Sequence, residues 1–355
     1  MSEETGKIKV GISIGDSNGI GLEVIMKTLA DSLLLEDIIP IVYGGAEVTK
    51  EHRKTLDLED FAFHGIQSAA MALPRKANLI HVIDEKTEVK FGEPTKASAL
   101  AALKSLESAV SDLASNKVDV LITAPIDKAN MQKAGFAFPG HTEYLAKMAN
   151  VDEHLMLLVN GSLRLGVVTG HIPLKDVPAT LSKELIGKKL RLLADSLRRD
   201  FGIRKPKIAV LGLNPHAGDN GALGSEEKEV ILPTIRDFKE EGALVFGPYA
   251  ADGFFGSDSF RKFDGILAMY HDQGLAPFKA LGFEEGVNFT AGLPIVRTSP
   301  DHGTAFDIAG KNVASPSSFR HAIYVACDVY RNRREFREIT ANPLPFRKVE
   351  REREH

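Results

Sequence analysis

Short apolar runs rich in β-branched residues alternate along this chain with longer segments of helical periodicity. Two of the longer segments, 96–116 and 182–202, repeat leucine, alanine or isoleucine at spacings of three and four, so each should lay one apolar stripe on a sheet. The alternation is typical of a largely parallel sheet covered by helices. The runs that predict strands are 7–15, 38–45, 78–84, 118–125, 154–159, 163–170, 206–214 and 265–270.

The middle of the chain carries a signal of a different kind. Asn160-Gly161 lies between two apolar runs and predicts a hairpin, which is an antiparallel excursion in an otherwise parallel pattern. At 355 residues the chain is also long for one compact core. The length favours two domains, or one large domain with insertions, and the hairpin suggests a change of domain near the middle of the chain.

Composition narrows the class of protein. Apolar residues make up 43% and charged residues 26%, as in globular proteins, and the net charge of −4 forms no basic stripe, which argues against nucleic acid as the main partner. The single cysteine, Cys327, lies in a helical-looking run, where we expect a small buried side chain. The N-terminal sequence lacks the features of a signal peptide and no apolar stretch reaches membrane-spanning length, so we expect a cytoplasmic protein without membrane partners.

Three histidines follow apolar runs at equivalent places: His171 after GVVTG, His216 after IAVLGLNP and His271 after GILAMY. Chemistry in open α/β sheets collects beyond the carboxyl ends of strands, where several loops converge. A lone histidine there is more often structural, but three in equivalent places favour a divalent ion with one open coordination position. Asp272 would then orient one imidazole, or serve as a helix cap.

The stretch 269–311 also gathers groups suited to an anion, and its glycines and prolines make it too irregular to predict a helix face. Lys279, Asn288 and Arg297 follow His271 there, and an ammonium and a guanidinium in a cleft suit a phosphate or a carboxylate. The alternative is a set of solvated surface charges. The loop GDSNGIGLEV after the first strand resembles a phosphate-cradling turn but lacks both the dinucleotide and the P-loop pattern.

A further anion candidate lies in FPGHTEYLAKM. His141 and Thr142 fall just before a predicted helix, whose free backbone donors favour an anion. The alternative is that Thr142 is only the N-cap of that helix.

Long motifs then give the chain a resemblance that spans nearly its whole length. GDSNGIG, TAPIDK, PGHTEYLA, GLNPHAGDNG, GPYAADGFF, YHDQG and RTSPDHGTAFDIAGK resemble the 4-hydroxythreonine-4-phosphate dehydrogenase family of pyridoxal phosphate biosynthesis. The resemblance implies an α/β fold similar to isocitrate and isopropylmalate dehydrogenases, with two α/β/α domains of mixed, largely parallel sheets and a cleft between them. The implied domains are 1–150 with 300–355, and 151–299, the latter with dimer and metal-binding contributions. The implied assembly is a homodimer with shared active sites.

The resemblance also assigns residues. It implies that a divalent metal, zinc, magnesium or cobalt, is held by three histidines, one of them from the other subunit: His171, His216 and His271. The phosphorylated substrate would contact His141, Thr142, Lys279, Asn288 and Arg297, and the adenosine part of NAD would lie near His302 and Gly303. The chain departs from the usual family pattern at Ser17, Asn18, Leu22 and Pro300, none of which is an expected ligand.

The expected reaction is NAD- and metal-dependent oxidation of 4-phosphooxy-L-threonine to 2-amino-3-oxo-4-phosphooxybutanoate, which decarboxylates to 3-amino-2-oxopropyl phosphate. Lys279 is the candidate proton relay and Asp272 a second catalytic candidate. Related enzymes with these motifs act on erythronate or threonate 4-phosphate or on cyclic diols, so a paralogous substrate stays open. Two other classes are a phosphate acyltransferase and a non-catalytic phospholigand sensor with structural zinc.

Overall fold

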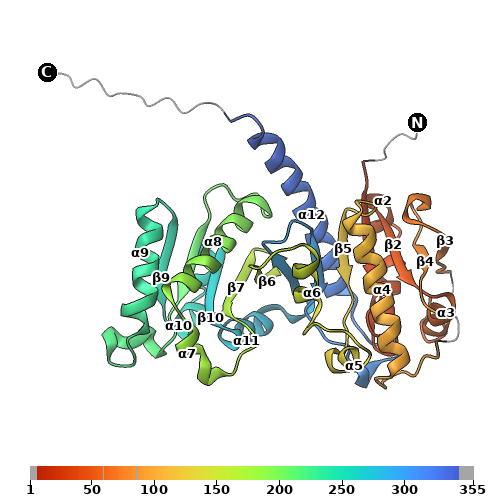
Figure 1. Cartoon of the computed structure of the whole chain (residues 1–355), viewed down its shortest axis with the longest axis horizontal. Helices are drawn as coiled ribbons and strands as arrows, with labels where there is room; N and C mark the ends of the chain where they lie inside the picture. The colour runs from red at the N-terminus through yellow and green to blue at the C-terminus, as the bar shows by residue number, and fades with distance from the viewer. Residues whose placement is uncertain (1–5, 59, 85–86, 344–355) are drawn as a thin grey trace.

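A computed structural model of the chain describes residues 6–58, 60–84 and 87–343, and its centre is one large sheet (Figure 1). The strand order in this part of the chain is β3-β4-β2-β1-β5-β12-β11-β6-β7-β10-β8-β9. Neighbouring strands are parallel except where β11 meets β12 and β6, and where β6 meets β7. The strands are β1 Ile8–Ser13, β2 Ile38–Gly44, β3 His64–Ile66, β4 Asn78–His81, β5 Val120–Thr123, β6 Leu155–Asn160, β7 Leu163–Thr169, β8 Lys207–Leu211, β9 Leu244–Tyr249, β10 Gly265–Tyr270, β11 Val287–Ala291 and β12 Arg297–Pro300.

Helices cover both faces of this sheet, which gives three layers (Figure 1). The longest, at the C-terminal end of the described chain, packs along the middle strands β5, β11 and β12. The α-helices are α1 Gly21–Leu29, α2 Leu34–Asp37, α3 Ala46–Lys54, α4 Lys96–Ala114, α5 Lys128–Lys133, α6 His141–Met148, α7 Val177–Thr180, α8 Lys183–Arg199, α9 Leu232–Glu240, α10 Ala251–Gly256, α11 His271–Gly282 and α12 Ser317–Thr340. None of the helices in the described ranges is long and apolar enough to cross a membrane.

The structure confirms the α/β fold with a largely parallel sheet. All eight predicted strands form, the two long predicted helices are α4 and α8, and β6 and β7 make the predicted hairpin around Asn160-Gly161. Cys327 is buried in α12, as expected, and is a free thiol. One sheet runs through the whole molecule: strands from 8–123 and 297–300 form one half and strands from 155–291 the other.

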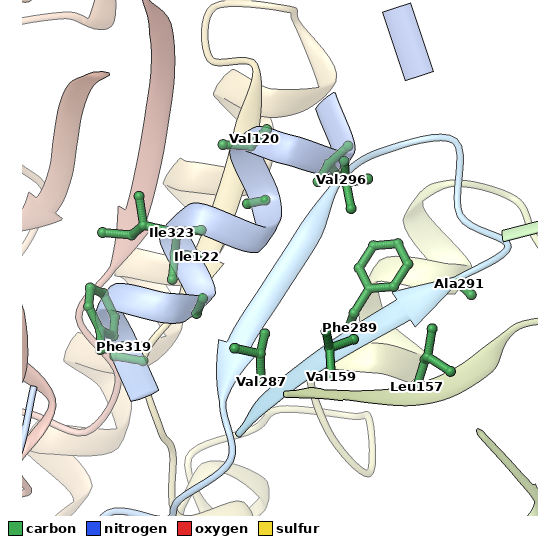
Figure 2. Packing of buried hydrophobic residues seen from close by; sticks show 14 of the residues in the cluster. Val120, Ile122, Leu157, Val159, Val287, Phe289, Ala291, Val296, Phe319 and Ile323 are labelled. Carbon is green, nitrogen blue, oxygen red and sulfur yellow. The ribbon is translucent and has the colours of Figure 1, made fainter. Parts of the chain in front are cut away.

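The apolar core differs between the two faces of the sheet. On one face a single cluster continues from β1 to β8 beneath α1, α12, α8 and α9. Figure 2 shows its middle, where Phe319 and Ile323 of α12 pack toward Val120 and Ile122, and Phe289 lies beside Val159. On the other face the apolar residues form two separate clusters, one under α4 and one under α10 and α11. The middle strands therefore have one fully covered face and one face where the helices separate.

Strand alternation decides which side chains reach the open face. Val287 and Phe289 of β11 point into the continuous core, so the residue between them, Asn288, points to the opposite side. On β12, the Thr298 hydroxyl donates to a backbone oxygen of α12, while Arg297 points to the open face. The polar residues of β11 and β12 that line the cavity, Asn288, Arg297 and Ser299, are thus directed to the open face.

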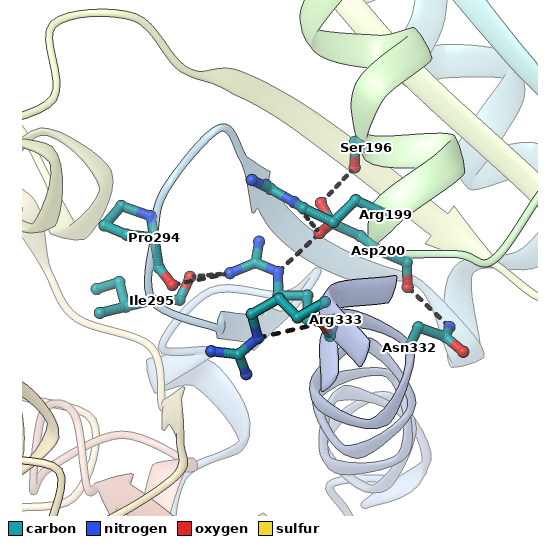
Figure 3. A network of polar contacts seen from close by, with 8 residues as sticks. Ser196, Arg199, Asp200, Pro294, Ile295, Asn332 and Arg333 are labelled. Atoms are coloured by element: carbon teal, nitrogen blue, oxygen red, sulfur yellow. Dashed lines mark hydrogen bonds and ion pairs between the residues drawn. The ribbon is translucent and has the colours of Figure 1, made fainter. Parts of the chain in front are cut away.

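A buried polar network joins the two halves behind the sheet (Figure 3). Asp200, at the end of α8, accepts hydrogen bonds from Arg333 of α12 and from Ser196, both at 2.7 Å. Arg333 also donates to the carbonyl oxygens of Pro294 and Ile295, on the segment that enters β12. Because Asp200 is fully buried, its carboxylate needs these donors, and the network fixes α8, α12 and the crossing segment to one another.

Candidate functional site

The open face holds a cavity of about 340 Å³ over the middle strands, between α6 and α11. These two helices lie near the centre of the molecule (Figure 1). Nine residues that the sequence analysis selected line this cavity: His141, Thr142, His171, His271, Lys279, Asn288, Arg297, His302 and Gly303. Segments up to 162 residues apart along the chain thus supply one site, because the ends of the middle strands meet there.

Arg297 is the most buried charged group of the cavity, with 3% of its surface exposed. It begins β12, and its guanidinium donates from Nε and Nη2 to the Thr123 hydroxyl, at 3.0 and 2.6 Å. Thr123 ends β5, the neighbouring parallel strand, and is fully buried. Burial lowers the pKa of Arg297 to about 10, which leaves it charged at neutral pH. The solvated-charge alternative is therefore wrong for Arg297.

His141 completes this side of the cavity. Arg297 Nη2 lies 3.2 Å from His141 Nδ1, and because a guanidinium has only donors, Nδ1 is the acceptor and the ring proton is on Nε2. Burial, Arg297 and Lys128 together hold the pKa of His141 well below its usual range, so the ring is neutral. Its buried Nε2 has no partner within the described residues. The neutral N–H donor of His141 and the cation of Arg297 therefore lie in the same cavity.

The start of α6 corrects one expectation. His141 and Thr142 are the first two residues of the helix rather than residues before it, and the N-cap is Gly140, which makes no side-chain cap. The alternative that Thr142 is the N-cap is wrong. Both residues lie in the first turn, where backbone N–H groups lack helical partners, and both line the cavity.

The opposite wall is α11, which the sequence analysis did not predict as a helix. His271, Leu275 and Lys279 are spaced four apart and all line the cavity, so they form one helix face. The interpretation of this stretch as irregular was wrong for 271–282, because Pro277 lies inside α11 and does not end it. Lys279 is 40% exposed at the cavity rim, and its Nζ lies 3.8 Å from Asp301 Oδ1.

His171 and His271 lie together, with ring centroids 5.6 Å apart. The Asp272 carboxylate lies 2.7 Å from His271 Nδ1, and since a carboxylate only accepts, Nδ1 carries the proton and Nε2 is left free. Partial burial, Lys128 and His271 lower the pKa of His171, which favours the neutral ring. These contacts give two imidazoles suited to one ion.

His216 is not beside these two rings in the single chain. It lines a separate cavity of about 510 Å³, together with Tyr270, Gln273 and Pro277, which lie on the other side of α11. Among the residues that the structure describes, no group of three His, Cys, Asp or Glu side chains could hold a metal ion. One chain therefore brings together two of the three predicted ligands.

His302 and Gly303 follow β12 at the end of the cavity. The His302 Nδ1–H donates to the Gly303 carbonyl oxygen at 3.1 Å, and its buried Nε2 has no partner in the described chain. The GDSNGIG loop lies behind this segment: Ile20 N donates to Thr304 O at 3.0 Å. Ser17 and Asn18 are fully buried and do not line the cavity, so the loop supports the site instead of forming a phosphate turn there.

Five polar or charged residues that line the cavity were missed by the sequence analysis: Thr123, Lys128, Glu143, Ser299 and Asp301. Thr123 and Lys128 lie in TAPIDK; the available signal was that Thr123 lies near the end of a predicted strand and Lys128 just after it. Burial raises the pKa of the Asp301 carboxyl, while Lys279 and His271 lower it. Asp301 directly precedes His302, so it too could have been selected from its place in the motif.

Known proteins resemble this chain over most of its length. Residues 36–326 match the family described as "Pyridoxal phosphate biosynthetic protein PdxA". A 4-hydroxythreonine-4-phosphate dehydrogenase of Bacteroides thetaiotaomicron is 50% identical over 96% of this chain and 94% of its own length. A protein of Oceanobacillus iheyensis, provisionally named a D-threonate 4-phosphate dehydrogenase, is 39% identical over 90% of this chain and 97% of its own.

Among solved structures, a 4-hydroxythreonine-4-phosphate dehydrogenase of Klebsiella pneumoniae superimposes with a TM-score of 0.79 at 35% identity, covering 93% of this chain and 99% of the other. On the length of the match and the identity of these relatives, the chain belongs to the PdxA family of pyridoxal phosphate biosynthetic proteins.

Proposed function

We propose that this protein is a homodimeric, NAD- and divalent-metal-dependent dehydrogenase that oxidises 4-phosphooxy-L-threonine to 2-amino-3-oxo-4-phosphooxybutanoate, which loses carbon dioxide to give 3-amino-2-oxopropyl phosphate. One observation carries the proposal. A single cavity combines a buried, charged Arg297 with a pair of imidazoles, His171 and His271. This combination suits a substrate with an anion at one end and an oxidisable hydroxyl at the other.

The phosphate end fits the Arg297 side of the cavity. Arg297 supplies a fixed charge, and His141 Nε2 supplies a donor without a partner in the described chain. Thr142, in the first turn of α6, adds a helix terminus that favours an anion, and Lys128, Lys279 and Asn288 line the same cavity. A phosphate held here would direct the rest of a short substrate toward the two imidazoles.

The imidazole side fits a divalent ion only in part. His171 and His271 offer two rings to one ion, and a third ligand is missing from this side among the described residues of one chain. His216 of the partner subunit is our candidate for that ligand. A bound zinc, magnesium or cobalt ion would polarise the substrate hydroxyl and lower its pKa.

The cofactor fits the segment His302–Gly303. His302 Nε2 is a buried acceptor without a partner in the described chain, which suits a hydroxyl or amino group, and Gly303 leaves open space where a side chain would stand. NAD bound there would accept the hydride from the substrate carbon. Of the chain's own groups, Lys279 Nζ is our candidate to move the hydroxyl proton, and Asp301 Oδ1, 3.8 Å away, holds that amine.

Subunit complementation tests the shared site. His171→Ala and His216→Ala should each lower turnover by at least ~100-fold, because the Lewis acid contributes several kcal/mol. Co-expression of the two variants with different tags should restore on the order of a quarter of wild-type turnover, since half of the dimers are mixed and each mixed dimer has one complete site.

The matched control combines His171→Ala with His271→Ala, which leaves every site without one ring and should restore nothing. Recovery in the control pair, or none in the first pair, would contradict a site completed by His216 of the partner subunit. NADH formation from a panel of 4-phosphorylated hydroxy acids, with and without added metal, tests the substrate. A clear preference for D-threonate 4-phosphate would favour a second candidate function, a D-threonate 4-phosphate dehydrogenase, which the name of the Oceanobacillus relative supports.

A further inference from the structure

Glu227 is a buried acid outside the cavity that the proposed reaction does not use. Its side chain is 4% exposed, and it begins a π-helical turn, Glu227–Ile231, that leads into α9. Among the described residues no lysine, arginine or histidine forms an ion pair with its carboxylate; instead, the carboxylate accepts from the segment that precedes His216. A buried carboxylate needs strong donors, so its contacts show what it holds in place.

Those donors come from two adjacent residues. Leu213 N and Asn214 N both donate to Glu227 Oε1, at 2.7 and 2.8 Å, and Asn214 Nδ2 donates to Oε2 at 2.9 Å. Asn214 Nδ2 also donates to Glu226 at 2.7 Å. The end of β8 is therefore fixed to the start of the π-helical turn two residues before His216.

The backbone after this anchor has an unusual conformation. Five successive residues, 216–220, have positive φ angles between 40° and 81°. Four of them are not glycine, and L-residues avoid this left-handed region unless other contacts hold them there. Gly218 is the residue that must lack a side chain, since a Cβ there would lie 2.6 Å from Glu227 Oε2. The left-handed turn thus forms against the same carboxylate.

The turn determines where the imidazole points. His216 is exposed and lines the cavity on the far side of α11 from His171 and His271. Gln273 of α11 donates to Gly212 O and accepts from Met269 N, so the base of the His216 loop is also tied to the end of β10. His216 therefore stands on a fixed loop that faces away from its own chain's imidazole pair.

We propose that Glu227 is a positioning residue: by holding the left-handed turn 216–220, its carboxylate presents His216 as a ligand for the partner subunit's metal ion. This inference rests on the proposed function, because it requires His216 to bind that ion. It extends the function by assigning a cause to the geometry of the third ligand. Groups that orient metal ligands in this way typically contribute 10- to 100-fold in metal affinity.

The test is metal binding by the chelator-stripped full-length protein, measured by calorimetry with Zn²⁺ and by the visible absorption of bound Co²⁺. Glu227→Ala should weaken both affinities by about 10- to 100-fold and change the Co²⁺ spectrum, because His216 loses its fixed position. Glu227→Gln keeps the oxygen that accepts from Leu213 and Asn214, and should recover part of the affinity. It also keeps the test decisive if the alanine variant does not fold.

Glu229→Ala is the matched control, since Glu229 is an exposed acid of the same π-helical turn, and it should bind both ions as wild type does. His216→Ala is the reference for the complete loss of that ligand. If His216→Ala binds zinc normally, the metal site of the proposed function is rejected. If His216→Ala loses affinity while folded Glu227→Ala and Glu227→Gln retain the wild-type value and spectrum, only the role of Glu227 is overturned.

Discussion

The Arg297 side of the cavity and its imidazole side differ in what one folded chain completes. On the Arg297 side, Thr123, His141 and Arg297 are buried and bonded to one another before any ligand is present. On the imidazole side, His171 is exposed, His271 is half-buried, and His216 lies in another cavity. Folding of one chain thus completes the anion-binding side, whereas we infer that the metal site requires association of two subunits.

The two sides of the cavity also differ in when their polar groups lose contact with water. Burying Arg297 and a neutral His141 removes both from water during folding, so an anion meets groups that are already desolvated and oriented. The imidazoles of His171 and His271 are less buried, so their desolvation would occur when an ion or a second subunit binds. We therefore expect substitutions on the two sides to respond to different measurements.

The largest effect is expected from Arg297→Lys. An ammonium cannot donate to Thr123 and an anion in the planar arrangement of the guanidinium, so kcat/KM should fall by about 10²–10³, equivalent to roughly 3–4 kcal/mol. Zinc affinity should stay within about threefold of wild type, since the two sides are separately built. Steady-state NADH formation and zinc titration measure the two quantities. Arg261→Lys, at a side chain 70% exposed, is the control.

A smaller effect is expected from Thr123→Val, which keeps the shape but removes the acceptor of two Arg297 hydrogen bonds. Leaving those charged donors unpaired costs about 1.5–3 kcal/mol, so KM should rise by about 10- to 100-fold with a much smaller change in kcat. Thr123→Ser should restore KM. Thr298→Val removes a buried hydroxyl that bonds to α12 instead, and a similar rise in KM there would contradict the role of Thr123.

The smallest effect is expected on the free energy of unfolding at acid pH, through the buried His52. His52 Nε2 lies 2.7 Å from Ser17 O, and burial lowers the pKa of His52 to about 4. The folded ring stays neutral while the unfolded ring takes up a proton below its usual pKa of about 6.5, so this stability is present above that pH and lost as pH falls toward 4. Between pH 7.5 and 5 the loss should be about 2 kcal/mol.

Urea unfolding across this range measures the loss. His52→Gln can still donate to Ser17 and has no titrating ring, so it should unfold with a shallower pH dependence. His64→Gln, at an exposed histidine, is the control. An unchanged slope in His52→Gln would show that the acid sensitivity of the fold arises elsewhere.

The apolar pattern predicted eight strands and missed β3, β9, β11 and β12, the last two of which carry residues of the cavity. β11 and β12 alternate core residues with Asn288, Arg297 and Ser299, so their apolar pattern is too short to recognise. β9 was missed because Pro248 lies inside it. Helix α11 was missed because Pro277 and Gly274 resemble breakers, although tertiary contacts of Leu275 and Phe278 keep the segment helical.

The same reasoning selected nine residues of the cavity but not the contacts between them. His141 was selected from its place before a predicted helix, and Lys279 and Arg297 as cations that follow His271, yet no spacing rule connects Arg297 with Thr123, which is 174 residues away. The direction of His216 was also beyond the sequence, because it depends on a left-handed turn of mostly non-glycine residues. The NAD, metal and dimer assignments and the domain boundaries stay predictions.

The continuous sheet has a consequence for how the cavity can change its width. Its base belongs to one hydrogen-bonded surface, since β12 joins β5 to β11 and β11 joins β6. The Asp200–Arg333 network fastens the same crossing from behind. One continuous sheet therefore extends across the base of the cavity. We expect the cavity to narrow around a substrate either by added twist in β11 and β12 or by movement of α6 and α11 over an unchanged sheet.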